Sequence, residues 1–149
     1  MRCFIMCGIS VKLLNIVRSM YDRTTARVCV DGEMSGPFAT CVGVRQGCVM
    51  SPLLFALFLN DLHESLTGGV NVKGKVIRVL MYADDIVIDA ESAGQLQVMM
   101  NELEVYCGMW DLEVNLDKSE VMVMRRGGGR MRDGERWVFD GNEVRVTGA

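Results

Sequence analysis

The sequence predicts an α+β fold in which helices pack on one face of an antiparallel sheet. Apolar residues recur with helical spacing in some segments, and they alternate or cluster in short runs in others. Glycine- and aspartate-rich turns separate the short runs, as expected between paired strands. The expected order is helix, hairpin, helix, strands, helix, strand and hairpin, and it indicates one mixed domain over residues 1–149.

The first expected helix covers residues 12–21, where apolar side chains recur at i, i+3, i+4 and i+7. An antiparallel hairpin follows it. Its strands are expected around residues 28–30 and 38–44, with a long loop over residues 31–37.

A second helix is expected to begin at Ser51-Pro52, with Ser51 as the N-cap and Pro52 at the first helical position. Residues 53–59 are apolar on every side, which predicts that this helix is deeply buried. Gly68-Gly69 is the expected end of the helix.

Three strands are expected next, over residues 70–72, 76–82 and 86–88. Ser92 and Gln95 have the spacing of a capping box and start the third helix. Its apolar stripe is expected to face the core and comprises Leu96, Met99, Met100, Leu103, Cys107 and Trp110.

A short strand over residues 121–124 leads into a Gly- and Arg-rich loop at about residues 125–136. The last expected element is a hairpin that pairs residues 137–139 with 144–146 and turns at residues 140–142.

Composition excludes several protein classes. Half of the residues are apolar and 23% are charged, which is an ordinary globular mixture rather than that of a disordered or fibrous chain. The longest apolar run, residues 53–59, is far shorter than the roughly 20 residues that span a bilayer. The six cysteines are irregularly spaced in apolar surroundings, which favours buried free thiols. We therefore expect an intracellular protein of the cytoplasm or nucleus, not a secreted one, and no membrane partner.

Charge is unevenly distributed along the chain. Residues 1–30 are net basic, residues 84–120 are strongly acidic, and residues 125–136 are again basic. This pattern suits a protein that holds polyanions and cations together, although separate solvated faces would give the same pattern.

Asp84-Asp85 is the most informative pair in the sequence. It stands between two apolar runs, at the expected tip of a buried hairpin. Adjacent carboxylates repel each other and lose hydration when buried, and a bound cation offsets that cost. Mg²⁺ prefers such oxygen ligands, so the pair is a candidate metal site. An exposed Asp-Asp turn without function is the alternative.

Three segments in order resemble the reverse transcriptases of non-LTR, LINE-type retrotransposons. Tyr82-Ala83-Asp84-Asp85 resembles their catalytic box, and residues 43–55 resemble the segment that contacts template and nucleotide. Residues 110–119 are similar to a later Asn-x-x-Lys element, and residues 138–141 to the approach to the primer grip. The resemblance implies a palm-like antiparallel sheet with helices on one face, here truncated at both ends.

The resemblance implies a role for each matching residue. Asp84 and Asp85 would be catalytic and would bind Mg²⁺, of which the intact family uses two ions in nucleotidyl transfer. Tyr82 would lie under the primer end. The implied contacts with template or nucleotide are those of Arg45, Gln46, Gly47 and Lys118.

Two of these assignments have equally simple structural alternatives. Lys118 would lie near the incoming triphosphate, or it would balance Asp117 and Glu120 on the surface. The loop at residues 125–136 would track a nucleic-acid backbone, or it would be a solvated loop.

The family uses a third carboxylate on a strand upstream of the helix expected at residues 12–21, and the sequence as given begins just before that helix. Neither Asp22 nor Asp31 has the expected position. We therefore expect an RNA-directed DNA polymerase domain, with RNA template, DNA primer and dNTPs as partners, that lacks activity and binds Mg²⁺ weakly as an isolated chain. The alternatives are a non-catalytic retroelement remnant that binds nucleic acid and an unrelated interaction module.

Overall fold

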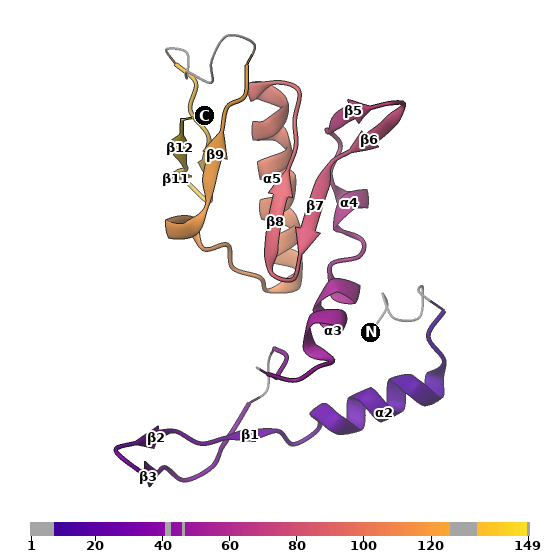
Figure 1. The fold of residues 1–149 in the computed structure, drawn as a ribbon, viewed down its shortest axis with the longest axis vertical. Coiled ribbons are helices and arrows are strands. Elements are labelled where there is room, and N and C mark those ends of the chain that lie inside the picture. Colours follow the sequence, from indigo (N-terminus) through magenta and orange to yellow (C-terminus); the bar gives the residue numbers. More distant parts are fainter. Residues whose placement is uncertain (1–7, 41–42, 46, 126–133, 149) are drawn as a thin grey trace. The chain divides into compact units, whose positions relative to one another are not determined.

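The fold was obtained as a computed structural model, which describes residues 8–40, 43–45, 47–125 and 134–148. These residues fall into two compact units, residues 1–60 and 61–149, and each unit is described by itself. Figure 1 labels the elements of both units along the chain.

The first unit begins with helix α2, Val11–Tyr21, as its apolar spacing predicts. Ser10 is its N-cap, because the Ser10 hydroxyl accepts a hydrogen bond from the Leu13 N–H at 3.3 Å. Leu14 is its buried residue.

A long hairpin follows α2, as expected, but its loop is much shorter than predicted. Strands β2 (Cys29–Val30) and β3 (Glu33–Met34) pair antiparallel, and only Asp31 and Gly32 connect them. Both turn residues have positive φ, 50° and 86°, as a type I′ turn requires. The Asp-Gly pair therefore sets the position of the turn, and strand β3 begins directly after it.

Strands β1 (Thr25–Ala26) and β4 (Phe38–Ala39) extend the same hairpin. The register shifts by one residue between the two ladders, so that Gly36 and Pro37 together oppose Arg27. Proline cannot donate to a ladder, and the extra residue at this bulge accommodates it.

Helix α3 covers Ser51–Phe58 and does not run to Gly68, so the prediction of one long helix is wrong. Asn60 and Asp61 follow it, and such side chains compete with helical backbone hydrogen bonds. Ser51 is the first helical residue rather than the N-cap, because its hydroxyl donates to the Arg45 carbonyl oxygen at 2.6 Å. Deep burial on every side is also wrong, since Leu53 is 61% exposed.

The second unit begins with the short helix α4, Leu62–Ser65, and continues into two hairpins. Strand β5 (Val70–Val72) pairs with β6 (Lys75–Ile77), and β7 (Val79–Tyr82) pairs with β8 (Asp85–Ile88). The single strand expected over residues 76–82 is thus divided. Its first part belongs to the β5–β6 hairpin and its second part to the β7–β8 hairpin.

Helix α5, Ala93–Trp110, forms as predicted. Its N-cap Ser92 accepts a hydrogen bond from the Gln95 N–H at 3.2 Å, while the Gln95 side chain accepts from the Glu91 N–H at 2.7 Å. The predicted apolar stripe supplies much of the core. Its buried members are Met99, Met100, Leu103 and Cys107, and Tyr106 joins them.

The C-terminal hairpin turns where predicted but ends earlier. Strands β10 (Val138–Phe139) and β11 (Asn142–Glu143) pair antiparallel. Strand β12 (Arg145–Thr147) then leaves the hairpin and pairs parallel with β9 (Glu120–Met122). The 3₁₀ helix η1, Leu116–Lys118, precedes β9.

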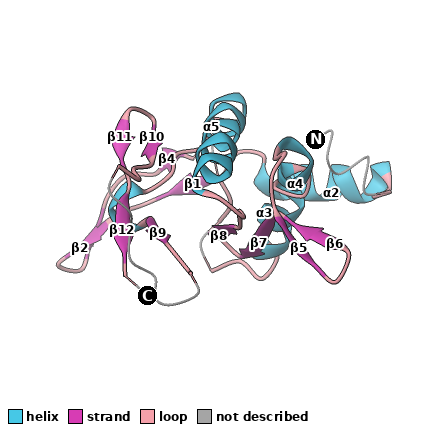
Figure 2. Ribbon diagram, turned by 90° about the horizontal axis from the view of Figure 1, so that it is seen from above, coloured by secondary structure: helices cyan, strands magenta, loops and turns pink. Residues whose placement is uncertain are grey.

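The mixed α+β class is confirmed. In the described part of the chain the strands form two-stranded ladders, of which β9–β12 is the parallel one. Figures 1 and 2 both place α5 on one side of β8 and β9. Trp137 donates its indole N–H to the Ala93 carbonyl oxygen at 3.2 Å and ties the C-terminal hairpin to the start of α5.

Candidate functional site

The carboxylate pair lies at the tip of the β7–β8 hairpin (Figure 1). Tyr82 and Asp85 form the last cross-strand pair, so Ala83 and Asp84 make the two-residue turn. Ala83 has a φ of +53°, whereas Asp84 does not have positive φ, which is the sign pattern of a type II′ turn. That first position favours glycine, so Ala83 is held in a strained conformation.

The tip is exposed, which corrects the prediction of a buried hairpin. Tyr82 is 84% exposed, and Asp84 and Asp85 are also exposed. The flanking strands expose Leu80 and Val87 as well, because β7 and β8 pair only with each other among the described residues. The two carboxylates are therefore accessible from solvent and are not enclosed by the hairpin.

A metal ion would find two adjacent carboxylates at this tip. Their oxygens match the ligand preference of Mg²⁺. Within the described ranges, however, no group of three His, Cys, Asp or Glu residues could hold a metal ion. Asp84 and Asp85 thus supply part of a ligand set.

The segment predicted to contact template lies in the first unit, between the long hairpin and α3. The Arg45 guanidinium carbon lies 5.8 Å from the centre of the Tyr21 ring, within the range of a cation–π contact. The Ser51 hydroxyl donates a hydrogen bond to the Arg45 carbonyl oxygen at 2.6 Å. The same hydroxyl lies 3.4 Å from the Tyr21 hydroxyl. These contacts connect Arg45 to the last residue of α2 and to the first residue of α3.

Gly47 has a φ of +76°, and no heavy atom lies within 4 Å of where a Cβ would stand. Glycine is therefore needed for the backbone conformation, and the space beside it is open to a ligand. Gln46 lies outside the described residues. The neighbouring Cys48 has a lowered pKa, chiefly because the Met50 backbone N–H hydrogen-bonds its thiolate.

Lys118 ends the 3₁₀ helix η1 in the second unit and is exposed. It forms no ion pair with any residue in the described part of the chain. Glu120, one of its expected surface partners, instead pairs with Arg145, its cross-strand neighbour on β12. The described residues therefore provide no ion-pair partner for the alternative in which Lys118 balances surface carboxylates.

Most of the Gly- and Arg-rich loop, residues 126–133, also lies outside the described residues. Its two ends meet, because Arg125 and Glu135 form an ion pair that raises the pKa of Arg125. No pattern in the sequence predicted this closure.

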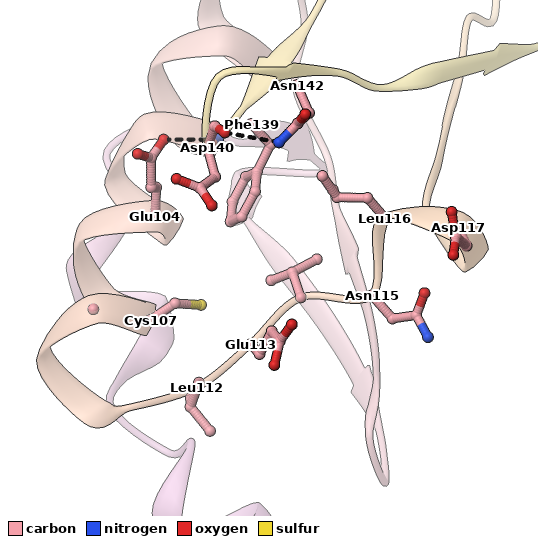
Figure 3. A pocket seen from close by; sticks show the side chains of 12 residues that line it. Glu104, Cys107, Leu112, Glu113, Asn115, Leu116, Asp117, Phe139, Asp140 and Asn142 are labelled. Atoms are coloured by element: carbon pink, nitrogen blue, oxygen red, sulfur yellow. Dashed lines mark hydrogen bonds between the residues drawn. The ribbon is translucent and has the colours of Figure 1, made fainter.

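A cavity of about 860 Å³ lies beside α5 (Figure 3). Glu104 and Cys107 of α5, residues 112–117 and Phe139 of β10 line it. Burial raises the pKa of the Cys107 thiol, which disfavours the reactive thiolate. No sequence pattern could have revealed this cavity, since its walls come from segments more than twenty residues apart.

The free cysteines only partly match the expectation of buried thiols. Cys107 is buried, Cys48 is half-buried and Cys29 is exposed on the long hairpin. Cys3, Cys7 and Cys41 lie outside the described residues. No helix of the described residues is long and apolar enough to cross a membrane.

The sequence profile of the family "Reverse transcriptase (RNA-dependent DNA polymerase)" matches residues 2–148. The chain belongs to the reverse transcriptase family. That match covers the β7–β8 tip, the Arg45 segment and Lys118 together.

Relatives of this reverse transcriptase domain come from non-LTR retrotransposons. It is 30% identical over 107 residues to the Pol polyprotein of the type-2 retrotransposable element R2DM of Drosophila melanogaster, which covers 70% of the chain. It is 32% identical over 118 residues, 75% of the chain, to the transposon TX1 149 kDa protein of Xenopus laevis. The RNA-directed DNA polymerase of the mobile element jockey of Drosophila melanogaster is 27% identical over 115 residues, 72% of the chain. The matched region is 10%, 9% and 12% of these relatives, so the chain spans about a tenth of their length.

Proposed function

We propose that this chain is the palm part of an RNA-directed DNA polymerase of a non-LTR retrotransposon, with Asp84 and Asp85 at its metal site. The exposed pair of adjacent carboxylates at the β7–β8 tip, inside a reverse transcriptase domain, is the observation that supports it. Its similarity to proteins of the elements R2DM and jockey supports the origin of the domain in a retrotransposon.

The turn explains how two neighbouring side chains can serve one ion. Asp84 occupies the turn and Asp85 the first position of β8, so the strict alternation of strand faces does not separate them. Asp84 is the direct ligand in this proposal, and Asp85 supports it. Bound Mg²⁺ would activate the primer hydroxyl and neutralise charge on the triphosphate.

The remaining residues hold substrates in this proposal. Tyr82 presents an exposed ring opposite Asp85, where a primer end can rest on it. Arg45 contacts phosphate, and Gln46-Gly47 lie against the template–nucleotide pair, since a glycine lets the backbone approach a base closely. Lys118 contacts the triphosphate, and its lack of an ion pair in the described residues favours this role over surface balance.

The β7–β8 hairpin is one piece of a larger antiparallel sheet in this proposal. Both strands leave an outer edge unpaired among the described residues, and Leu80 and Val87 are 54% exposed. Exposed apolar strands with free edges are unfavourable unless further strands or helices cover them.

Two ions a few ångströms apart need several shared anionic ligands. The described residues bring two carboxylates to the tip, so we propose that the isolated chain binds a divalent ion weakly and does not extend primers. A third ligand from outside the described residues would complete the site.

Metal binding tests the site directly. The enhancement of water proton relaxation by Mn²⁺ gives the affinity of the intact chain for a divalent ion. Asp84→Asn should weaken that affinity by about tenfold, equivalent to about 1.4 kcal/mol. Asp31→Asn is the matched control, because Asp31 is an exposed carboxylate in another two-residue hairpin turn, where glycine and not a second aspartate follows it. Equal affinities in the wild type and Asp84→Asn would refute the site.

Primer extension on an RNA template, with dNTPs and Mg²⁺, tests the second part of the proposal. The isolated chain should give no more product than Asp84→Ala. Template-directed product above that control would show that the chain is a complete polymerase and would overturn the proposed incompleteness.

A further inference from the structure

The β5–β6 hairpin is a basic element that no motif accounts for. Residues 70–78, here called the basic hairpin, contain Lys73, Lys75 and Arg78 and no acidic residue. Lys73 and Gly74 form its turn, and Lys73 and Lys75 are exposed. It stands within a chain of net charge −3 and five residues before the acidic stretch at residues 84–120, so its charge is locally distinctive.

The positive charges of this hairpin are not neutralised inside the described unit. Three arginines of the same unit each pair with a glutamate, namely Arg125 with Glu135, Arg136 with Glu143 and Arg145 with Glu120. The three basic residues of the hairpin have no such partner among the described residues. Exposed lysines without an ion-pair partner can bind an external anion without breaking an internal ion pair.

Arg78 strengthens this argument because it is half-buried and fixed. Its Cγ lies 2.9 Å from where a Cβ on Gly69 would stand, so the glycine makes room for the arginine stem. Its Nε is buried, and no described residue accepts a hydrogen bond from it. Because Nε is enclosed, a contact with a phosphate outside the protein would be made by the two terminal guanidinium nitrogens of this half-buried side chain.

The position of the hairpin indicates which anion it meets. Strand β7 begins at Val79, directly after Arg78, and leads to the carboxylate tip, while the basic hairpin projects from the opposite end of β7 (Figure 1). The six residue steps from Arg78 to Asp84, which include the turn at Ala83-Asp84, span at most roughly 20 Å. One strand of a duplex advances about 3.4 Å per nucleotide, so this length corresponds to about six base steps.

We propose that the basic hairpin binds the sugar–phosphate backbone of the template–primer duplex about six base steps from Asp84. This inference rests on the proposed function, because that function places the duplex end at the carboxylate tip. Lys73 and Lys75 neutralise phosphates as point charges, and Arg78 donates hydrogen bonds. Such contacts carry no sequence preference and position the duplex along β7.

The experiment measures the salt dependence of duplex binding by the intact chain. Fluorescence anisotropy gives the affinity for a labelled hybrid of RNA and DNA, about 20 base pairs long, between about 0.05 and about 0.3 M salt. Each phosphate that the protein no longer neutralises lowers the slope of log K against log salt by about 0.9. Lys73→Gln/Lys75→Gln should therefore lower the slope by about 1.8 and weaken binding by about tenfold or more at about 0.1 M salt. Lys12→Gln/Arg18→Gln, on exposed positions of α2, removes the same charge and should change the slope less.

An unchanged slope in the hairpin variant, or an equal reduction in the α2 variant, would overturn the proposal. Absence of hybrid binding by the wild-type chain would also overturn it. So would displacement of the labelled hybrid by poly-glutamate, an anion without phosphates, as effectively as by unlabelled hybrid. Lys73→Arg/Lys75→Arg keeps both charges and should restore the slope, which separates the removal of charge from misfolding. Asp84→Asn should lose Mn²⁺ affinity but keep the slope of log K against log salt for hybrid binding. The metal-binding measurement therefore tests the proposed function, and the salt dependence tests the basic hairpin.

Discussion

Tyr82 and Asp85 face each other as the last cross-strand pair of the β7–β8 hairpin, and this pairing forces Ala83 and Asp84 into the turn. The carboxylate that the proposed chemistry needs most is thus presented by a two-residue turn with a strained alanine. An alternative register would move Asp84 into a strand and Tyr82 to the other face of the ladder. Turn geometry and the proposed metal site are therefore coupled.

Replacement of Ala83 by glycine should stabilise the chain. Ala83 has a φ of +53°, a conformation that costs an L-residue roughly 1–2 kcal/mol but costs glycine little. Part of the gain is offset by the greater backbone entropy of glycine, so we expect the free energy of unfolding to rise by about 0.5–1 kcal/mol. Urea denaturation measures it.

The same substitution in a helix provides the control. Ala56 is exposed within α3, so Ala56→Gly should lower the free energy of unfolding by about 1 kcal/mol. Destabilisation by both substitutions would mean that the turn at Ala83 does not have the positive φ described.

Cys107 should resist alkylation in the native chain. Its side chain is 7% exposed and burial raises its pKa, so little thiolate is present or accessible. At mildly alkaline pH, iodoacetamide should modify the exposed Cys29 at least about tenfold faster, as located by peptide mass spectrometry. In urea the two rates should converge, and equal native rates would contradict the burial.

The raised pKa of Cys107 also makes the free energy of unfolding depend on pH. The folded state favours the neutral thiol, so this contribution is fully present below the ordinary pKa of an unfolded cysteine. As the pH rises beyond that value the unfolded state loses its proton first, and stability falls. Cys107→Ala should remove this alkaline loss, although it lowers stability at neutral pH by leaving a small cavity. Urea denaturation at a series of pH values measures both effects.

Elements with strong local signals could be predicted from the sequence. Helices α2 and α5 formed because Ser10 and Ser92 cap regular apolar stripes. The Asp140-Gly141 turn formed for a similarly local reason, since both residues have positive φ.

Features that depend on distant partners could not be predicted. The chain changes partner at Arg78, between a strand that pairs with β5 and a strand that pairs with β8, and Arg78 alone did not indicate that the predicted strand divides there. The parallel pairing of β12 with β9 joins segments about 25 residues apart in sequence. At the site, Asp84 and Asp85 could be recognised as a pair, but their exposure and the free edges beside them depend on what else packs there.

Glu102 should stabilise the loop that leads into the basic hairpin. Its two carboxylate oxygens accept hydrogen bonds from the Thr67 N–H at 2.8 Å and from the Thr67 hydroxyl at 2.6 Å. Hydrogen bonds to a charged group contribute about 1.5–3 kcal/mol, so Glu102→Ala should lower the free energy of unfolding by about 2 kcal/mol. Glu113→Ala, which removes an exposed carboxylate of the same unit, should change it by less than about 0.5 kcal/mol.

Gly68→Ala should be strongly destabilising because the glycine lies against α5. A Cβ there would stand 2.3 Å from Met99 Sδ and 2.9 Å from Gln95 Cγ, and Met99 is fully buried. Such overpacking costs about 1–3 kcal/mol in the free energy of unfolding, measured by urea denaturation. Gly94→Ala is the control. No atom lies within 4 Å of its Cβ position in α5, so it should stabilise the chain by about 0.5–1 kcal/mol.

A double-mutant cycle identifies Met99 as the cause of that destabilisation. Met99→Ala alone leaves a cavity and costs about 2–5 kcal/mol. In its background the contact with Met99 is gone and only the contact with Gln95 Cγ at 2.9 Å remains, so Gly68→Ala should cost less than in the wild type and the two effects should be non-additive by about 1 kcal/mol. Strict additivity would mean that Met99 is not the cause of the destabilisation.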